Sequence, residues 1–340
     1  MKSPYILCDS QIFDLQKFGG ISRYFCEIIS RLNIKYDISV RYTENHYLKN
    51  SKLSKHFLYL PHFIFKRYEW KLYRKNRKLT KKILQSTSPY LFHPTYYDPY
   101  FLKYIGKNPF VVTVHDMIYE LYPQYFNDSK EIISHKREII TKANRIIAIS
   151  ENTKKDIINI LNIDPSKIDV IYHGTSIQTP CKKNKLQLPQ RYILFVGDRV
   201  TYKNFQRLLE EKALHLNVST QIMQIPIDDK KLNELYARAL LFVYPSLYEG
   251  FGIPILEAYS CNCPVALSKA SCFPEIAGDA GAYFDPYSIE SIANTISDCI
   301  YNEEKRIELI KKGKERLKLY SWEKAAQETE AVYQKVLSGI

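Results

Sequence analysis

Short apolar runs alternate with longer amphipathic stretches along almost the whole chain. The short runs are rich in branched and aromatic residues, which is typical of parallel strands covered on both faces. The longer stretches carry apolar residues at helical spacing. The predicted strands are residues 5–9, 36–42, 90–93, 110–115, 145–150, 167–172, 192–196, 241–244, 265–267 and 282–284. The predicted helices are residues 21–32, 65–83, 128–144, 151–161, 204–212, 230–239, 254–260, 288–317 and 322–336.

A polar, proline-bearing segment without periodicity, residues 175–191, divides this alternation in two. Such a segment is typical of a linker. Repeated strand–helix units on both sides predict two Rossmann-like, doubly wound α/β domains. We place the N-terminal domain at residues 1–180, the C-terminal domain at 181–320 and a final helix at 321–340, which we expect to cross back to the N-terminal domain.

Composition indicates a globular protein of the cytoplasm. Of the 340 residues 45% are hydrophobic and 25% charged, so two cores can be buried. No stretch approaches the ~20 apolar residues of a membrane-spanning helix. The first nine residues become acidic too early for a signal peptide. The seven cysteines form no Cys-x-x-Cys pair, which fits reduced thiols, and Cys261 and Cys263 lack further metal ligands nearby.

The net charge of +13 is concentrated in one predicted helix. Nine of the seventeen residues 66–82 are Lys or Arg. An apolar stripe on this helix is formed by Phe65, Tyr68, Leu72, Leu79 and Ile83. Two interpretations stay open: residues 65–83 lie on an anionic membrane surface, or they form a surface helix packed on its own domain.

The segment from Glu249 to Glu257 carries the clearest chemistry. It follows a predicted strand, contains Gly250 and Gly252 and leads into a helix that Pro254 can begin. The free amides of a helix N-terminus bind anions such as phosphate. Glu249 in the loop and Glu257 one turn inside the helix can contact different parts of one ligand, one near a sugar ring and one near ribose hydroxyls. The alternative is an ordinary loop–helix junction with solvated or capping glutamates.

This segment, preceded by Tyr-Pro-Ser and followed by Pro264-Val265, closely resembles the retaining glycosyltransferases of GT-B fold, family 4. The resemblance extends over most of the chain. Further matching stretches are Gly19-Gly20-Ile-Ser-Arg-Tyr, Val114-His115-Asp116, Ile147-Ala-Ile-Ser150, Gly197-Asp-Arg199 through Lys203-Asn204, Pro274-Glu275-Ile-Ala-Gly and Ser321-Trp322-Glu323. The resemblance implies two Rossmann-like domains facing each other across a cleft.

When a nucleotide diphosphate leaves the sugar, negative charge grows on it, and the enzyme must compensate that charge with a positive group. The chain has no Asp-x-Asp motif to hold a metal ion, so we expect a metal-independent hexosyltransferase without a cofactor. Arg199 and Lys203, after a predicted strand, can supply the charge instead. Gly19 and Gly20 lack side chains, so they would let the backbone of this domain approach the phosphates across the cleft. Alternatively, they merely form a turn before the following helix.

The resemblance assigns the remaining roles. Glu249 is expected to contact the transferred sugar, Glu257 the ribose and His115 the donor sugar or the acceptor, with retention of configuration. The expected catalytic residues are His115, Arg199, Lys203 and Glu249. The expected donor-binding residues are Gly19, Gly20, Arg199, Lys203, Ile225, Gly250, Phe251, Gly252, Ile253 and Glu257.

The expected partners are a nucleotide sugar, with UDP-glucose preferred over GDP-mannose, and a saccharide or lipid-linked saccharide acceptor of surface-polysaccharide assembly. Attachment to the inner face of the plasma membrane goes with the membrane interpretation of residues 65–83. The tyrosine-rich stretch 90–100 offers rings on which an acceptor sugar can stack, although packing is the alternative use of those rings.

Two features depart from the family pattern. The stretch 204–240 is shorter than in the family by a strand–helix unit of roughly 30 residues, which is either absent or missing from this sequence. The nucleobase contact at Ile225 depends on that stretch. Asn262 stands where the family has glycine, and asparagine tolerates the left-handed backbone of such a turn.

Other classes of protein explain less. A basic nucleic-acid-binding protein would account for the charge but leaves the segment 249–257 unexplained. A dinucleotide-dependent dehydrogenase needs Gly-x-Gly-x-x-Gly after a strand, which the chain lacks. A glycosidase with two glutamates has no use for a phosphate-binding helix. We therefore expect a glycosyltransferase and no nucleic-acid partner.

Overall fold

The computed structural model describes residues 4–51, 53, 57–177, 186–197, 201–211, 219–222 and 229–339. The chain forms two compact units. Unit 1 comprises Met1–Ile149, Thr153–Ile171 and Trp322–Ile340, and unit 2 comprises Ser150–Asn152 and Tyr172–Ser321. The boundary predicted at residues 180–181 lies outside the described residues.

Unit 1 is built on parallel strands that form two sets, joined by a parallel bridge between Phe92 and Phe110. Their order across the sheet is β2 (Tyr36–Ile38), β1 (Tyr5–Cys8), β5 (Tyr90–His93), β6 (Val111–Val114), β7 (Arg145–Ala148) and β8 (Ile168–Val170). The strand order reverses direction between β1 and β5. In doubly wound sheets, ligands bind outside the carboxyl ends of the strands at such a switch point.

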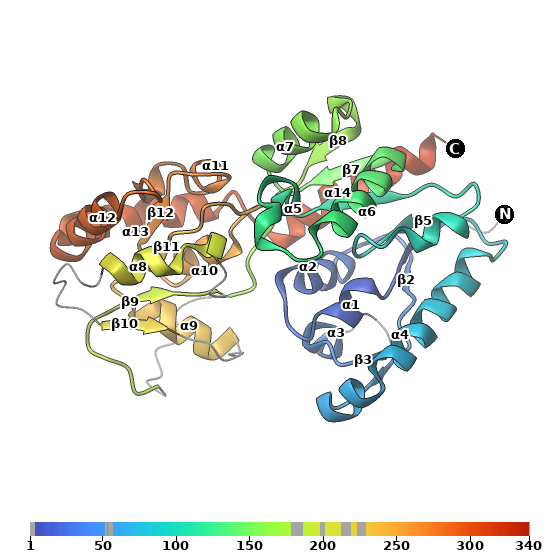
Figure 1. The fold of residues 1–340 in the computed structure, drawn as a ribbon, viewed down its shortest axis with the longest axis horizontal. Helices are drawn as coiled ribbons and strands as arrows, with labels where there is room; N and C mark the ends of the chain where they lie inside the picture. The colour runs from blue at the N-terminus through green and yellow to red at the C-terminus, as the bar shows by residue number, and fades with distance from the viewer. Residues whose placement is uncertain are drawn as a thin grey trace. The chain divides into compact units, whose positions relative to one another are not determined.

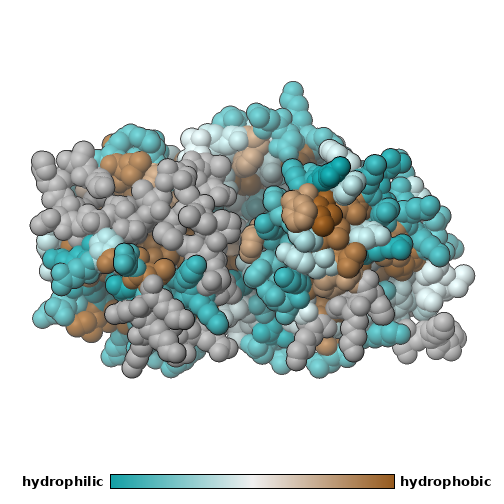
Figure 2. All heavy atoms as spheres, turned by 90° about the horizontal axis from the view of Figure 1, so that it is seen from below, coloured by the Kyte–Doolittle hydropathy of each residue, from teal (hydrophilic) through white to brown (hydrophobic). Residues whose placement is uncertain are grey.

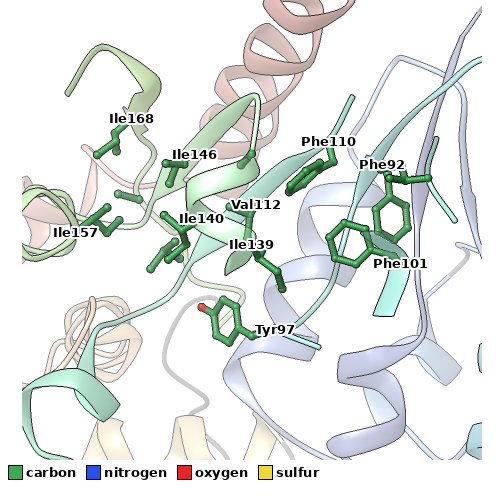
Figure 3. Packing of buried hydrophobic residues seen from close by; sticks show 14 of the residues in the cluster. Phe92, Tyr97, Phe101, Phe110, Val112, Ile139, Ile140, Ile146, Ile157 and Ile168 are labelled. Carbon is green, nitrogen blue, oxygen red and sulfur yellow. The ribbon is translucent and has the colours of Figure 1, made fainter. Parts of the chain in front are cut away.

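Helices and two short strands surround this sheet (Figure 1). They are α1 (Gln11–Leu15), α2 (Gly20–Ile29), β3 (Tyr42–Thr43), α3 (His46–Asn50), β4 (Leu58–Tyr59), α4 (His62–Leu84), η1 (Pro99–Lys103), α5 (Ile118–Leu121), η2 (Pro123–Tyr125), α6 (Ser129–Lys142), α7 (Glu151–Leu161), η3 (Pro165–Lys167) and α14 (Trp322–Ser338). Figure 3 shows their core, where Phe92 of β5 and Phe101 of η1 pack together and Ile139 of α6 lies against Val112 of β6. The ring centroids of Phe92 and Phe101 are 4.8 Å apart.

Unit 2 contains a five-stranded parallel sheet. Its order is β10 (Ser219–Ile222), β9 (Tyr192–Phe195), β11 (Leu241–Tyr244), β12 (Val265–Ser268) and β13 (Gly281–Phe284). Its helices are η4 (Thr201–Lys203), α8 (Phe205–Glu211), α9 (Asp229–Arg238), α10 (Ile253–Ser260), α11 (Phe273–Ala277), η6 (Gly278–Ala280), α12 (Ile289–Tyr301) and α13 (Glu303–Leu317). The order reverses between β9 and β11. The predicted fold class, two Rossmann-like α/β domains with the last helix returning to the first, is confirmed.

Three local predictions need correction. The predicted strand 36–42 is two strands, β2 and β3, which pair with different partners. Within the stretch 204–240 no strand was predicted, yet β10 pairs with β9 and α9 follows it; the shortening of this stretch relative to the family stays a prediction. Tyr68 belongs to the apolar stripe predicted for residues 65–83, yet it is 43% exposed, unlike the buried Phe65 and Leu72 of the same stripe.

The buried side of α4 continues through a polar residue instead. Asn76 is fully buried, and its Oδ1 accepts hydrogen bonds of 3.0 Å from the amides of Arg41 and Tyr42. A buried amide side chain is stable when its hydrogen bonds are made. Periodicity of apolar residues alone therefore shifted the predicted face of this helix.

Hydrophilic side chains cover most of the coloured surface in Figure 2, and hydrophobic ones gather in small patches between them. Among the described residues no helix is both long and apolar enough to cross a membrane. The six cysteines in this part of the chain are buried and free of disulfides.

Candidate active site

Two predicted site residues meet at the switch point of unit 2. Lys203 ends η4, which follows β9, and Glu249 lies in the loop after the neighbouring strand β11. Lys203 Nζ lies 2.5 Å from Glu249 Oε1, although the residues are 46 positions apart. Their side chains are 15% and 14% exposed, so the ion pair is largely shielded but reachable. Arg199 lies outside the described residues.

Contacts with two distant residues fix the loop between Glu249 and α10. The backbone amide of Glu249 donates to Ser271 Oγ at 3.1 Å. Phe251 is buried, and its ring stacks on His173 with centroids 4.8 Å apart. The Phe251 side chain therefore anchors the loop. Neither Ser271 nor His173 could be found from local sequence, because each acts on a loop far from it in the chain.

Gly252 sets the start of α10. Its backbone is left-handed, with φ of +92°, and a side chain there would meet Ile255 and Phe273 at 3.1 and 3.2 Å. Only glycine fits both conditions. Ile253 and Pro254 then form the first turn of α10. Pro254 has no N–H and the Ile255 amide donates to the Gly252 carbonyl at 2.9 Å, so this helix start acts on a ligand through its dipole and the Ile253 amide. Such a helix start favours a negatively charged ligand.

Glu257 lies one turn further along α10 and is 5% exposed. Its Oε2 accepts a hydrogen bond of 3.2 Å from the hydroxyl of Tyr236 on α9. Tyr236 was not predicted as a site residue, and no local pattern marks it. Ile225, the predicted nucleobase contact, lies outside the described residues.

In unit 1 the structure brings Gly19, Gly20 and His115 into one neighbourhood. Gly19 precedes α2 and leaves room for the side chain of Gln16, whose Oε1 accepts from the amide of Ser22 at 3.1 Å. One turn further, the Tyr24 ring packs edge-on against His115 with centroids 5.1 Å apart. His115 follows β6, and its amide donates to the Tyr97 hydroxyl at 3.0 Å.

The environment of His115 keeps its ring neutral. The residue is 7% exposed, and burial, followed by the positive charge of Lys136, lowers its pKa to about 3. A neutral imidazole can donate or accept a hydrogen bond but carries no charge at pH 7. His115 is therefore suited to contact a sugar hydroxyl and unsuited to act as a cationic phosphate ligand.

Lys136 of α6 is a buried cation that was not predicted from the sequence. Its side chain is 0% exposed, and its Nζ donates to the Asp116 carbonyl at 2.8 Å and to Glu120 Oε2 at 2.9 Å. It thereby fixes the chain directly after His115. The available signal was its spacing, since Lys136 shares a helix face with Ile132, Ile139 and Ile140.

Comparisons with known proteins agree with this fold. Residues 18–179 match the family model described as Glycosyltransferase Family 4. Residues 179–316 match the model described as Glycosyl transferases group 1. The two matches together span residues 18–316 and meet at residue 179.

Individual proteins resemble the chain over nearly its full length. It is 27% identical to O-antigen chain mannosyltransferase B of Escherichia coli, covering 92% of this chain and 95% of that protein. A structure of sucrose-phosphate synthase from Thermosynechococcus elongatus superimposes with a TM-score of 0.76 at 17% identity, covering all of both chains. HepE of Anabaena in complex with UDP and glucose gives 0.73 at 16% identity, covering 97% of this chain and 99% of HepE.

Proposed function

The chain is a glycosyltransferase of the GT-B fold, and we propose that it transfers a hexose from a nucleotide-diphosphate sugar to a saccharide of surface-polysaccharide assembly. The observation that carries this proposal is the Lys203–Glu249 pair at the switch point of unit 2, directly before the N-terminus of α10. A cation, a helix N-terminus and a carboxylate are the groups needed for a phosphate and a sugar side by side.

Each group has a separate task in the proposed reaction. Lys203, aided by the N-terminal dipole of α10, stabilises the charge that grows on the diphosphate as the bond between the sugar and the diphosphate breaks. Glu249 accepts hydrogen bonds from the transferred sugar, and Glu257 accepts them from the ribose. The absence of an Asp-x-Asp motif supports a reaction without a metal ion. Retention of configuration is proposed from the family resemblance.

The donor sugar we propose first is mannose. The support is the full-length relative from Escherichia coli, which is named a mannosyltransferase. The second candidate is UDP-glucose, the donor preferred from the sequence alone. Its support is that HepE, which has a similar fold, was crystallised with UDP and glucose. The Escherichia coli mannosyltransferase carries more weight here, because HepE is only 16% identical to this chain and its likeness indicates only the fold.

A panel of nucleotide sugars tests the donor. GDP-mannose, UDP-glucose, UDP-galactose and GDP-fucose are each added to the protein with EDTA present, and both thermal stability and slow hydrolysis are measured. We expect one GDP- or UDP-hexose to raise the melting temperature and to be hydrolysed, with GDP-mannose ahead of UDP-glucose. A protein that hydrolyses none of them, with or without Mg²⁺, is not the enzyme proposed.

We further propose that α4 attaches the protein peripherally to an anionic membrane, at the inner face of the plasma membrane, where a lipid-linked acceptor would lie. Six basic side chains line one open groove along α4: Lys71, Arg74, Lys75, Arg77, Lys78 and Lys81. On the same helix Phe63 is 75% exposed and Trp70 78%. Basic and aromatic side chains on one helix are the groups that bind lipid headgroups and enter the interface.

Charge removal on α4 tests the membrane contact. Changing Lys71, Lys75 and Lys78 to Gln should weaken binding to phosphatidylglycerol-containing vesicles by about 1 kcal/mol per lysine, as measured by co-sedimentation. The matched control changes Lys311 and Lys314 of α13, and Lys318 directly after it, to Gln; these side chains are also exposed. Equal losses in both triple variants would mean that only net charge matters and that α4 is an ordinary surface helix.

A further inference from the structure

Two residues beside the Lys203–Glu249 pair have an unusual backbone. Asn204 follows Lys203 directly and has φ of +57°, and Ser271, between β12 and α11, has φ of +45°. Both lie in the left-handed region, which is unfavourable for residues with a side chain. Of the four non-glycine residues with positive φ in the described part of the chain, three are asparagines and the fourth is Ser271. Such strain persists where the surrounding structure imposes it, and it gathers at functional sites.

We propose that Ser271 and Asn204 are positioning residues, which hold Glu249 and Lys203 where the donor needs them. The proposal rests on the function proposed above and adds two residues that act on the reaction through the ion pair. Neither of the two needs to touch the donor itself.

The Ser271 hydroxyl holds the backbone at Glu249. Its Oγ accepts a hydrogen bond of 3.1 Å from the Glu249 amide, across 22 positions of the chain. Glu249 lies after β11 and Ser271 after the neighbouring strand β12, so the contact joins two loops at the carboxyl edge of the sheet. Glycine would adopt the left-handed backbone without strain, but it has no hydroxyl to accept this hydrogen bond. The serine therefore serves the loop of Glu249 rather than its own turn.

The side chain of Asn204 fixes the chain directly after Lys203. Asn204 is 4% exposed, and its Nδ2 donates to the Pro286 carbonyl at 2.8 Å, in the segment after the edge strand β13. Its Oδ1 accepts from Arg207 Nη1 of α8 at 2.8 Å. Both ends of the buried amide are thus hydrogen-bonded, which is how such a group becomes stable in a core. Asn204 therefore ties the end of η4 to α8 and to the segment after β13.

The ammonium group of Lys203 is confined as well as its backbone. Its Nζ lies 5.1 Å from the centroid of the Tyr202 ring and 5.8 Å from that of Tyr244, and a cation within about 6 Å of a ring is attracted to its face. A side chain bounded by two rings and a carboxylate has little room to adjust when its backbone moves. A displacement of about 1 Å at a reacting group can cost about 100-fold in rate. The anchor at Asn204 therefore bears on the reaction.

Two variants of Ser271 separate its hydroxyl from its strained backbone. Ser271→Gly removes both, whereas Ser271→Ala removes the hydroxyl and keeps the strain. We expect either variant to lower kcat at least about tenfold, with a smaller change in KM for the donor, because Glu249 loses its anchor. Ser271→Gly should nevertheless melt about 2–4 °C above Ser271→Ala, because glycine adopts the left-handed backbone freely. If Ser271 were purely structural, activity would follow the melting temperature.

Asn204→Gly keeps the left-handed backbone and removes both side-chain hydrogen bonds. It should also lower kcat at least about tenfold. The matched control is Asn262→Gly. Asn262 lies in the same unit with φ of +58°, but its side chain is exposed. Its replacement should leave kcat within about twofold of the wild-type value.

Double variants show whether the two residues act through the ion pair. In a protein that already carries Glu249→Ala, Ser271→Gly should lower kcat by no more than about twofold further. Asn204→Gly should behave likewise in a protein that carries Lys203→Ala. Single-turnover kinetics measures each loss. Losses that multiply in the double variants, or a Ser271→Gly enzyme with wild-type kcat, overturn the inference.

Hydrogen exchange of the unliganded protein tests the positioning without a donor. The backbone amides of residues 248–252 should exchange faster in Ser271→Gly than in wild type, and at the wild-type rate in Asn262→Gly, as measured by mass spectrometry. Faster exchange in a protein that hydrolyses no nucleotide sugar supports the anchoring of Glu249 and contradicts the proposed function. Unchanged exchange in Ser271→Gly removes the positioning role, and hydrolysis by the wild type then leaves the proposed function standing.

Discussion

Changing Lys203 or Glu249 to Ala should lower kcat for sugar transfer by at least about 10²- to 10³-fold. Lys203 is the described cation at the switch point of unit 2, and Glu249 is the carboxylate bonded to it. In the unliganded protein the two charges neutralise each other at 2.5 Å. We expect that, when the donor binds, the phosphate replaces Glu249 as the partner of Lys203 and the carboxylate turns to the sugar. Single-turnover kinetics with the donor found in the panel measures the loss.

The double variant sharpens this prediction. If the two residues act as one unit, Lys203→Ala with Glu249→Ala should cost about as much as either change alone. A matched control is the pair Lys312 and Glu308 on α13, joined at 2.6 Å in the same unit but more exposed. Alanine at either control position should leave kcat within about twofold, because exposed ion pairs contribute little. Normal turnover in Lys203→Ala or Glu249→Ala would show that the site lies elsewhere.

Changing Lys136 to Met should destabilise unit 1 by about 3–5 kcal/mol. The substitution removes the cation that lies 2.9 Å from Glu120, whose side chain is 4% exposed. Glu120 Oε1 has no hydrogen-bond partner among the described residues, so the carboxylate depends on Lys136. An unpaired buried carboxylate costs several kcal/mol. Both tryptophans, Trp70 and Trp322, belong to unit 1, so urea unfolding followed by tryptophan fluorescence reports this unit.

Two further variants make the Lys136 result specific. Lys142→Met on the same helix breaks a comparable ion pair, to Glu138 at 2.7 Å, but its side chain is 55% exposed. Its effect on the free energy of unfolding should stay within about 1 kcal/mol. Adding Glu120→Leu to Lys136→Met should recover much of the lost stability, because both buried charges are then gone. A loss no larger than that of Lys142→Met would mean that the pair contributes nothing.

Much of this protein is determined locally in the sequence. The strand β11 and the helix α7 occur at the predicted residues, because a buried parallel strand and an amphipathic helix each leave a pattern within a few neighbouring positions. The start of α10 was predictable for the same reason, since Gly252 and Pro254 act on their own backbone. The family resemblance and the fold follow from such local features taken in order.

The tertiary structure decided which distant groups are partners. Lys203 and Glu249 meet because β9 and β11 are neighbours, and Tyr236 reaches Glu257 because α9 and α10 pack together. Lys136 is buried because Glu120 and the Asp116 carbonyl satisfy it, although its residue type predicts exposure. The periodicity of apolar residues in the sequence indicates which face of a helix or strand is buried. Ion pairs and cavities depend instead on which elements the fold brings together.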